Sequence, residues 1–96
     1  MGANGTIVLV DDDQNILDLQ QEALRQIGLE AQTFCDPLAA WEHLQKGGVR
    51  LLVSDWEMPG MTGMELLFKS RGLDFPPFVI LLTGNGSVDR AVGAMT

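Results

Sequence analysis

Three consecutive aspartates, Asp11, Asp12 and Asp13, directly follow an apolar run at residues 6–10 of this 96-residue chain. A run of this kind, rich in β-branched residues, predicts a buried strand. Carboxylates packed side by side repel one another and raise one another's pKa unless a cation lies among them. In α/β sheets, ligands bind at the carboxyl ends of the strands. We therefore expect a positively charged ligand at this strand end.

Two other apolar runs also end in residues that could do chemistry. Residues 51–53 lead into Ser54 and Asp55, and residues 78–82 lead into Thr83. The carboxyl ends of parallel strands lie on one edge, so these groups are expected to converge there with the first acidic cluster. Hard oxygen ligands suit Mg²⁺. A carboxylate beside such an ion can attack phosphorus and form an aspartyl phosphate. Thr83 could donate a hydrogen bond to a phosphoryl oxygen.

The elements that must position these residues alternate between strand and helix signals. After the first strand, apolar residues at helical spacing predict a helix over residues 14–27. Asp13 is its predicted N-cap and Gly28 its predicted stop. Residues 29–34 follow as a short edge strand. The periodic apolar residues of this helix are Ile16, Leu17, Leu19, Ala23, Leu24 and Ile27.

A second helix and another strand come next. Asp36 followed by Pro37 predicts a helix start, with a capping carboxylate and proline at the first helical position. A glycine pair at residues 47–48 predicts its end. The uninterrupted apolar run at residues 51–53 is typical of a strand covered on both faces. The buried side of the helix is predicted to carry Trp41 and Leu44.

The remaining elements complete an alternating order of four strands and four helices. Residues 78–82 predict a fourth strand that is also buried on both faces, and Ser87 is expected to cap a last helix. This alternation predicts an α/β fold with a doubly wound parallel sheet and helices on both faces. The third helix is expected to bury Met64, Leu67 and Phe68, and the last helix carries Val88, Ala91, Val92 and Met95.

Composition limits the classes of function. The apolar fraction of 46% is that of an ordinary globular domain, and the length allows one domain at most. A net charge of −7 argues against nucleic-acid binding by this segment. No apolar stretch approaches the roughly 20 residues of a membrane span, so no membrane partner is expected. The single Cys35 excludes an internal disulfide framework and favours a cytoplasmic location.

Three segments together resemble the receiver domain of two-component response regulators. They are residues 7–13, residues 54–63 with the sequence Ser-Asp-Trp-Glu-Met-Pro-Gly-Met-Thr-Gly, and residues 81–84. Their order and spacing match across essentially the whole chain. The resemblance implies a flavodoxin-like, CheY-like three-layer sandwich. It also implies a signalling switch, which catalyses only its own phosphorylation and dephosphorylation, in place of an enzyme that acts on other substrates.

The resemblance implies a role for each site residue. Asp55 would be the phosphoacceptor, which receives its phosphoryl group from a sensor histidine kinase or a phosphotransfer protein. Asp12 would contact Mg²⁺ directly, with Mn²⁺ as the alternative ion, and Asp11 would act mostly through water. Asp55 and the backbone carbonyl of Glu57 would complete the metal ligands. Thr83 would be the switch hydroxyl.

Further positions follow from the same resemblance. The side chains of Glu57 and Asn85 would tune the lifetime of the aspartyl phosphate, because they lie where the family helps or hinders the attacking water. Asp13 would lie outside the site, as a helix cap. The kinase would dock near residues 14–18. The active loops would contain Trp56, Met58, Pro59, Gly60 and Gly84.

The sequence departs from the family near its end. Nothing matches the family's fifth strand, its fifth helix, or the lysine that follows that strand, and Lys46 and Lys69 lie in helix contexts. Residues 1–5 are expected to be a start or tag remnant, and residues 6–96 a receiver domain that is incomplete at its C-terminus. Without a fifth strand, residues 78–82 would form an open edge. We therefore expect the chain to continue beyond Thr96, or another chain, as in a homodimer, to cover that edge.

Three rival interpretations stay open on the sequence. Asp11, Asp13 and Asn15 mimic an EF-hand loop, but Ile16 stands where that loop needs glycine and a strand precedes it. Asp11 and Asp13 also fit the opening Asp-x-Asp of haloacid-dehalogenase-type phosphatases, although that family's later lysine and acidic pair are missing. The third rival is a receiver-like module that binds partners without being phosphorylated.

Overall fold

Apolar runs form the strands of one parallel sheet in the computed structural model, in which residues 6–82 are described. Within this part, β1 (Ile7–Val10), β2 (Gln32–Phe34), β3 (Leu51–Asp55) and β4 (Phe78–Leu82) lie in the order β2-β1-β3-β4. All neighbouring strands pair in parallel. The predicted last helix, Thr83, Gly84, Asn85 and residues 1–5 lie outside the described residues.

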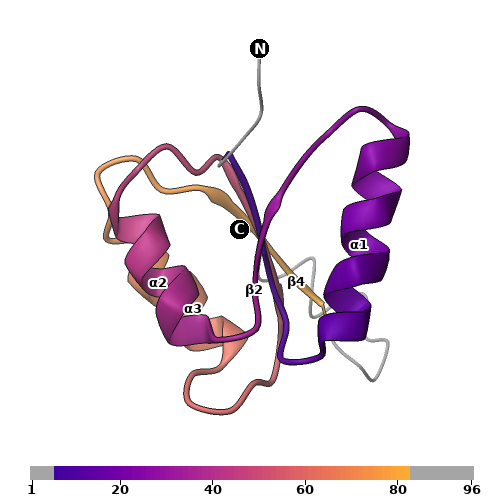
Figure 1. Ribbon diagram of the computed structural model, residues 1–96. Helices are drawn as coiled ribbons and strands as arrows, with labels where there is room; N and C mark the ends of the chain where they lie inside the picture. Colours follow the sequence, from indigo (N-terminus) through magenta and orange to yellow (C-terminus); the bar gives the residue numbers. More distant parts are fainter. Residues whose placement is uncertain (1–5, 83–96) are drawn as a thin grey trace.

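Helices cover both faces of this sheet, so the predicted doubly wound α/β architecture is confirmed. Helix α1 (Gln14–Gln26) lies on one face, and α2 (Pro37–Gln45) and α3 (Gly63–Ser70) lie together on the other (Figure 1). The change of face follows from the strand order, because right-handed crossovers toward β2 and away from it cross opposite sides of the sheet. The strand order therefore reverses between β1 and β3, where doubly wound sheets bind their ligands.

Alternation along the strands divides the core into two clusters. Val8 and Val10 of β1 join the larger cluster, under α2 and α3, whereas Ile7 and Leu9 join the smaller one, under α1. The continuous apolar pattern of β1 thus reflects burial on both faces. The larger cluster contains Val8, Val10, Ala40, Leu44, Val49, Leu52, Met58, Met61, Leu66, Leu67, Val79 and Leu81, and the smaller one contains Ile7, Leu9, Leu17 and Ala31.

The predicted helix starts are confirmed by their caps. The Asp13 carboxylate accepts a hydrogen bond from the Asn15 backbone N–H at 2.9 Å, and the Asp36 carboxylate accepts one from Leu38 at 3.0 Å. Each bond satisfies one of the backbone donors that a helix start leaves free. Among the periodic residues of α1, Leu17 alone is buried, and Ile27 is 71% exposed. The apolar periodicity therefore predicted the position of the helix correctly. It predicted more buried side chains on this helix than the described part of the chain contains.

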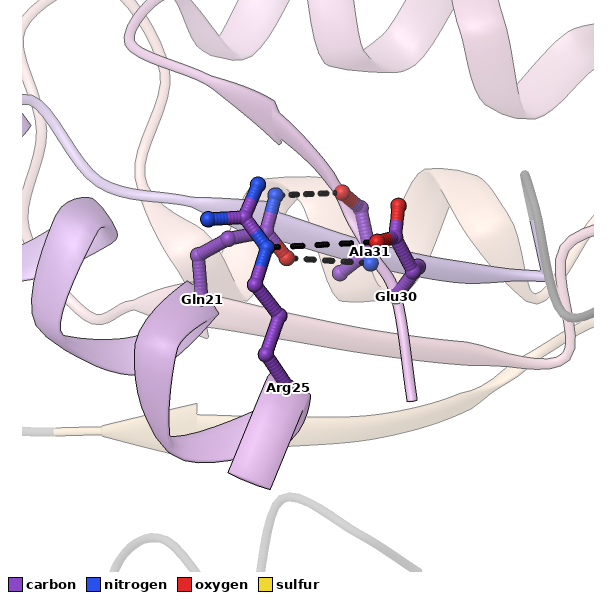
Figure 2. Close-up of polar contacts among 4 residues, drawn as sticks. All are labelled: Gln21, Arg25, Glu30 and Ala31. Atoms are coloured by element: carbon purple, nitrogen blue, oxygen red, sulfur yellow. Dashed lines mark hydrogen bonds and ion pairs between the residues drawn. The ribbon is translucent and has the colours of Figure 1, made fainter. Parts of the chain in front are cut away.

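A side-chain amide joins α1 to the start of β2. Gln21 donates to the Ala31 carbonyl oxygen at 2.7 Å and accepts from the Ala31 N–H at 3.0 Å, as Figure 2 shows. Beside it, Arg25 and Glu30 form an exposed ion pair at 3.9 Å, which contributes little to stability. The amide thus satisfies both backbone groups of Ala31, the residue that precedes β2.

Two predicted burial patterns are wrong. Phe68 of α3 is 62% exposed, whereas Leu67 is buried. In β4, Val79 and Leu81 are buried beneath α3, but Phe78 is 74% and Leu82 39% exposed. The reason is the two-residue alternation of a strand, which turns Phe78 and Leu82 to the face that α1 covers only in part. None of the helices within residues 6–82 is long and apolar enough to cross a membrane.

Candidate functional site

The ends of β1 and β3 bring three carboxylates together. Val10 pairs with Ser54 in the sheet, so Asp11 and Asp55 follow as neighbours at the carboxyl edge. One carboxylate oxygen from each of Asp11, Asp12 and Asp55 lies within 4.8 Å of the other two. The cluster thus lies where the strand order reverses, and it joins residues that are far apart in the sequence.

Asp11 is the buried member of the cluster, with 8% of its surface exposed. Burial raises the pKa of its carboxyl group, since the charged form loses contact with water. The Asp13 N–H, which donates to Asp11 Oδ1 at 2.9 Å, opposes this shift, and the negative charges of Asp12 and Asp13 add to it. The charged form of Asp11 is therefore less favourable in the folded chain than in the unfolded chain.

Asp55 is half-buried, and its carboxyl group also has a raised pKa. Burial raises the pKa of its carboxyl group, and the charge of Asp11 raises it further. The Trp56 N–H donates to Asp55 Oδ1 at 2.9 Å and partly offsets the shift. The other charges that act on Asp55, those of Asp12 and Glu57, are also negative. A cation among these oxygens would relieve the repulsion, so the donor set suits a hard metal ion.

The structure separates Asp13 from this cluster. Its side chain is exposed and caps α1, as the sequence predicts. Asp12, in contrast, is exposed at the mouth of the cluster, where a ligand from solvent can reach its carboxylate. The EF-hand interpretation is wrong, because β1 precedes the acidic run and α1 already begins at Gln14, so a twelve-residue loop cannot form.

The loop between β3 and α3 is anchored to the core by Trp56, Met58 and Met61. Met58 and Met61 are 7% and 6% exposed and belong to the larger cluster, and Trp56 packs against it as a half-buried side chain. Glu57, Pro59 and Gly60 are exposed. Gly60 has φ +89°, a left-handed conformation that favours glycine. Two methionines therefore fix the position of the loop, and Glu57, Pro59 and Gly60 remain at the surface.

Four residues that shape this loop were given no structural role by the sequence analysis. Thr62 and Glu65 form a capping box, with Thr62 Oγ1 accepting from Glu65 N–H at 3.1 Å and Glu65 Oε1 accepting from Thr62 N–H at 2.8 Å. Their Thr-x-x-Glu spacing is a signal that could have found them. Ser54 is fully buried and donates to the Asp55 carbonyl at 2.9 Å. Gly63 packs directly on Asp55, and no sequence pattern reveals that contact.

The remaining predicted site residues are placed as follows. Thr83, Gly84 and Asn85 lie outside the described residues. Lys46 is the C-cap of α2, and Lys69 lies in α3 with its ammonium 5.6 Å from the centre of the Trp41 ring. Both lysines thus have the helix contexts that their sequence positions predict.

Comparison with known proteins identifies one family. The family model for the response regulator receiver domain matches residues 7–96. The chain is 33% identical over 95 residues to the C4-dicarboxylate transport transcriptional regulatory protein DctD of Rhizobium meliloti. This match covers 99% of this chain and 21% of DctD. It is 34% identical over 95 residues to the transcriptional regulatory protein FixJ of Bradyrhizobium diazoefficiens, covering 99% of this chain and 46% of FixJ. The chain thus spans less than half the length of either relative.

A solved structure supports the same comparison. The response regulator protein TrrA of Thermotoga maritima, crystallised in complex with Mg²⁺ and BeF, superposes with a TM-score of 0.79 at 31% identity. The match covers 98% of this chain and 81% of TrrA. The haloacid-dehalogenase interpretation has no support from these matches.

Proposed function

The chain belongs to the response regulator receiver family of two-component systems, and on this premise we propose that Asp55 is its phosphoacceptor. Residues 6–96 would form the receiver domain. The single observation that carries the proposal is the cluster of Asp11, Asp12 and Asp55, with oxygens within 4.8 Å of one another at the edge where the strand order reverses. A signalling switch of this family needs a carboxylate that can accept a phosphoryl group, and Asp55 in this cluster meets that need.

In the proposed reaction, a carboxylate oxygen of Asp55 attacks the phosphorus of a phosphohistidine on a partner protein. The P–O bond forms as the P–N bond breaks, and the imidazole leaves with the electron pair and takes up a proton from solvent. The Trp56 N–H holds Oδ1 of Asp55 at 2.9 Å. This bond leaves Oδ2 of the same carboxylate as the attacking oxygen.

The cluster suits Mg²⁺, with Mn²⁺ as an alternative. Asp12, Asp55 and the backbone carbonyl of Glu57 would hold the ion directly, and Asp11 mostly through water, which matches the few protein ligands that Mg²⁺ accepts. When bound, the ion would neutralise charge on the incoming phosphoryl group. The raised pKa values of Asp11 and Asp55 support a cation at this place. TrrA, similar over nearly the whole chain, was solved with Mg²⁺ and BeF.

The partner would be a sensor histidine kinase or a phosphotransfer protein in the cytoplasm. We place its docking surface at the start of α1, near residues 14–18, where Ile16 is 38% exposed and Gln14, Asn15 and Asp18 are exposed polar neighbours. Thr83 would act as the switch hydroxyl. Glu57 and Asn85 would tune the lifetime of the aspartyl phosphate, and a bound phosphoryl group would shift the chain between two conformations.

The test is labelling by acetyl phosphate and Mg²⁺, read by intact mass. The wild-type chain should gain one phosphoryl group, and Asp55→Asn should gain none while keeping its far-ultraviolet circular dichroism. Asp36→Asn is the matched control, because it makes the same chemical change at a helix cap outside the cluster, where asparagine caps as well as aspartate. Asp36→Asn should be labelled like the wild type.

Other outcomes would favour the rivals. Unreduced labelling of Asp55→Asn would refute the assignment of the phosphoacceptor. No labelling of the wild-type chain would favour a receiver-like module that only binds partners. Turnover of an aryl phosphate that is lost in Asp11→Asn but kept in Asp55→Asn would favour the phosphatase interpretation.

A further inference from the structure

Two glycines, Gly60 and Gly63, lie close to the start of α3, and each position needs glycine for a different reason. Gly60 has φ +89° and open space around the position of a Cβ atom. Gly63 is the first residue of α3 and has no such left-handed φ. A Cβ atom at Gly63 would overlap the backbone carbonyl oxygen of Asp55, and it would lie 3.2 Å from the Asp55 carbonyl carbon and 3.1 Å from Leu81 Cδ2. Gly63 is therefore required by a contact and not by its own conformation.

The contact falls on a peptide unit whose other atoms are all engaged. The Asp55 carbonyl oxygen accepts the Ser54 hydroxyl at 2.9 Å. The Trp56 N–H of the same peptide donates to the Leu82 carbonyl at 2.7 Å and to Asp55 Oδ1 at 2.9 Å. The Trp56 carbonyl in turn accepts the Gly63 N–H at 2.8 Å. The orientation of the Asp55–Trp56 peptide thus sets the direction of the Asp55 carboxylate.

We propose that Gly63 is a positioning residue for Asp55: its missing side chain lets the first turn of α3 close onto the Asp55–Trp56 peptide and hold the carboxylate in its reactive direction. The expected effect of Gly63 on phosphorylation rests on the proposed function of Asp55. The expected effect of Gly63 on the geometry of the Asp55–Trp56 peptide is independent of that function.

The surroundings of Gly63 leave a larger residue no easy escape. The capping box of Thr62 and Glu65 fixes the helix start on both sides of position 63. Leu66, in the same turn, is fully buried beneath the sheet. The atoms that a Cβ would meet first belong to the backbone of β3, which is paired with strands on both sides. Any relief of the overlap must therefore move the Asp55–Trp56 peptide relative to the first turn of α3.

The experiment compares Gly63→Ala with Gly72→Ala in the full chain. Gly72 lies after α3, and a Cβ atom there would make only an ordinary contact, 3.5 Å from the Lys69 carbonyl. The first measurement is the backbone amide shift of Trp56 in nitrogen-15 spectra without any phosphoryl donor. The second is the rate of acetyl-phosphate labelling at saturating Mg²⁺ and donor. Thermal melts report the fold.

We expect Gly63→Ala to shift the Trp56 amide and to slow saturated labelling roughly 10- to 100-fold, as misplacement of a reactive group by about 1 Å does. Gly72→Ala should match the wild type in both measurements. Val49→Ala, a core truncation near the opposite edge of the sheet, controls for lost stability, and its labelling rate should stay within about twofold at a temperature where the chain is folded. An unchanged Trp56 amide in Gly63→Ala would overturn the inference.

Two further variants separate the peptide from the packing. Adding Leu81→Val to Gly63→Ala removes the Leu81 methyl group but not the clash with the backbone, so the labelling rate should stay low. Recovery of the rate would assign the effect to core packing and overturn the inference. If Gly63→Ala does not fold, Ser54→Ala tests the same peptide, and loss of its hydrogen bond should shift the Trp56 amide and slow labelling about fivefold. No change in Ser54→Ala would overturn the inference.

A wild-type chain that is not labelled at Asp55 would refute the proposed function alone. In that event, the Trp56 amide in Gly63→Ala still decides whether Gly63 positions the Asp55–Trp56 peptide.

Discussion

The two faces of the sheet differ in how far the described residues cover them. On the face of α2 and α3, a cluster of twelve buried residues reaches from β1 to β4. On the face of α1, four residues are buried, and Leu24, Leu51 and Val53 pack against them only in part. A groove lined by Leu9, Leu24, Ile80 and other apolar side chains runs beside α1. Within residues 6–82, the face of α2 and α3 is thus well covered (the closed face), and the face of α1 is covered only in part (the open face).

The difference shows how packing is distributed around the candidate site. Met58, Met61 and Gly63 tie the loop after Asp55 to the closed face. The start of α1, next to Asp11 and Asp12, lies on the open face and keeps Ile16 exposed. Asp55, the proposed phosphoacceptor, is therefore held by the well-packed side, while the surface that we propose for a partner belongs to the less covered side.

Truncation of Leu66 should give the largest effect. This side chain is fully buried on the closed face, and Leu66→Ala should lower the free energy of unfolding by about 4 kcal/mol, since the packed surroundings cannot collapse into the cavity. Denaturant unfolding measures it. A loss below about 2 kcal/mol would show that the closed face is looser than its burial indicates.

The same truncation on the open face should cost less. Leu17 is also fully buried, but Leu17→Ala should lower the free energy of unfolding by only about 2 kcal/mol, because α1 can settle toward the sheet and water can enter from the groove. The two leucine variants form a matched pair in one unfolding experiment. Equal losses would remove the energetic distinction between the faces.

The cap of α3 should contribute a smaller amount. Thr62→Ala removes the hydroxyl that accepts the Glu65 N–H, and it should lower the free energy of unfolding by about 1 kcal/mol. Thr62→Ser keeps the hydroxyl and should behave like the wild type. If both variants lose the same stability, the methyl group of Thr62 and not its hydroxyl is responsible.

The smallest predicted effect is a pH dependence at the acidic edge between the two faces. The pKa values of Asp11 and Asp55 are raised in the folded chain, so the folded state holds these protons more tightly than the unfolded state. Their contribution to stability is favourable below the raised pKa values and is lost as the pH rises through them. Melting curves without divalent ions should therefore show a stability gain on acidification that is smaller in Asp11→Asn and Asp55→Asn than in the wild type. An equal gain in all three proteins would contradict the assigned pKa shifts.

The sequence predicts the elements far better than the cover on each face. Apolar runs and capping residues such as Asp13 and Asp36 locate strands and helix starts because these signals are local. The exposure of Phe68, Phe78 and Ile27 depends on which other elements pack against them, which is not a local property. The approach of the three carboxylates follows from parallel topology once the strands are known. The contact between Gly63 and Asp55 depends on the path of a loop that no periodicity describes.

The two hydrogen bonds between the Gln21 side chain and the Ala31 backbone have a consequence for the order of folding. It closes a loop of only ten residues, and loops of that length close in about 10–100 ns. Pairing of β1 with β3, in contrast, must bring together segments separated by most of the first half of the chain. Helix α1 and the start of β2 can therefore assemble as a local unit before the strands that carry the carboxylates meet. On this view the acidic edge, where like charges repel, is among the last parts of the chain to form.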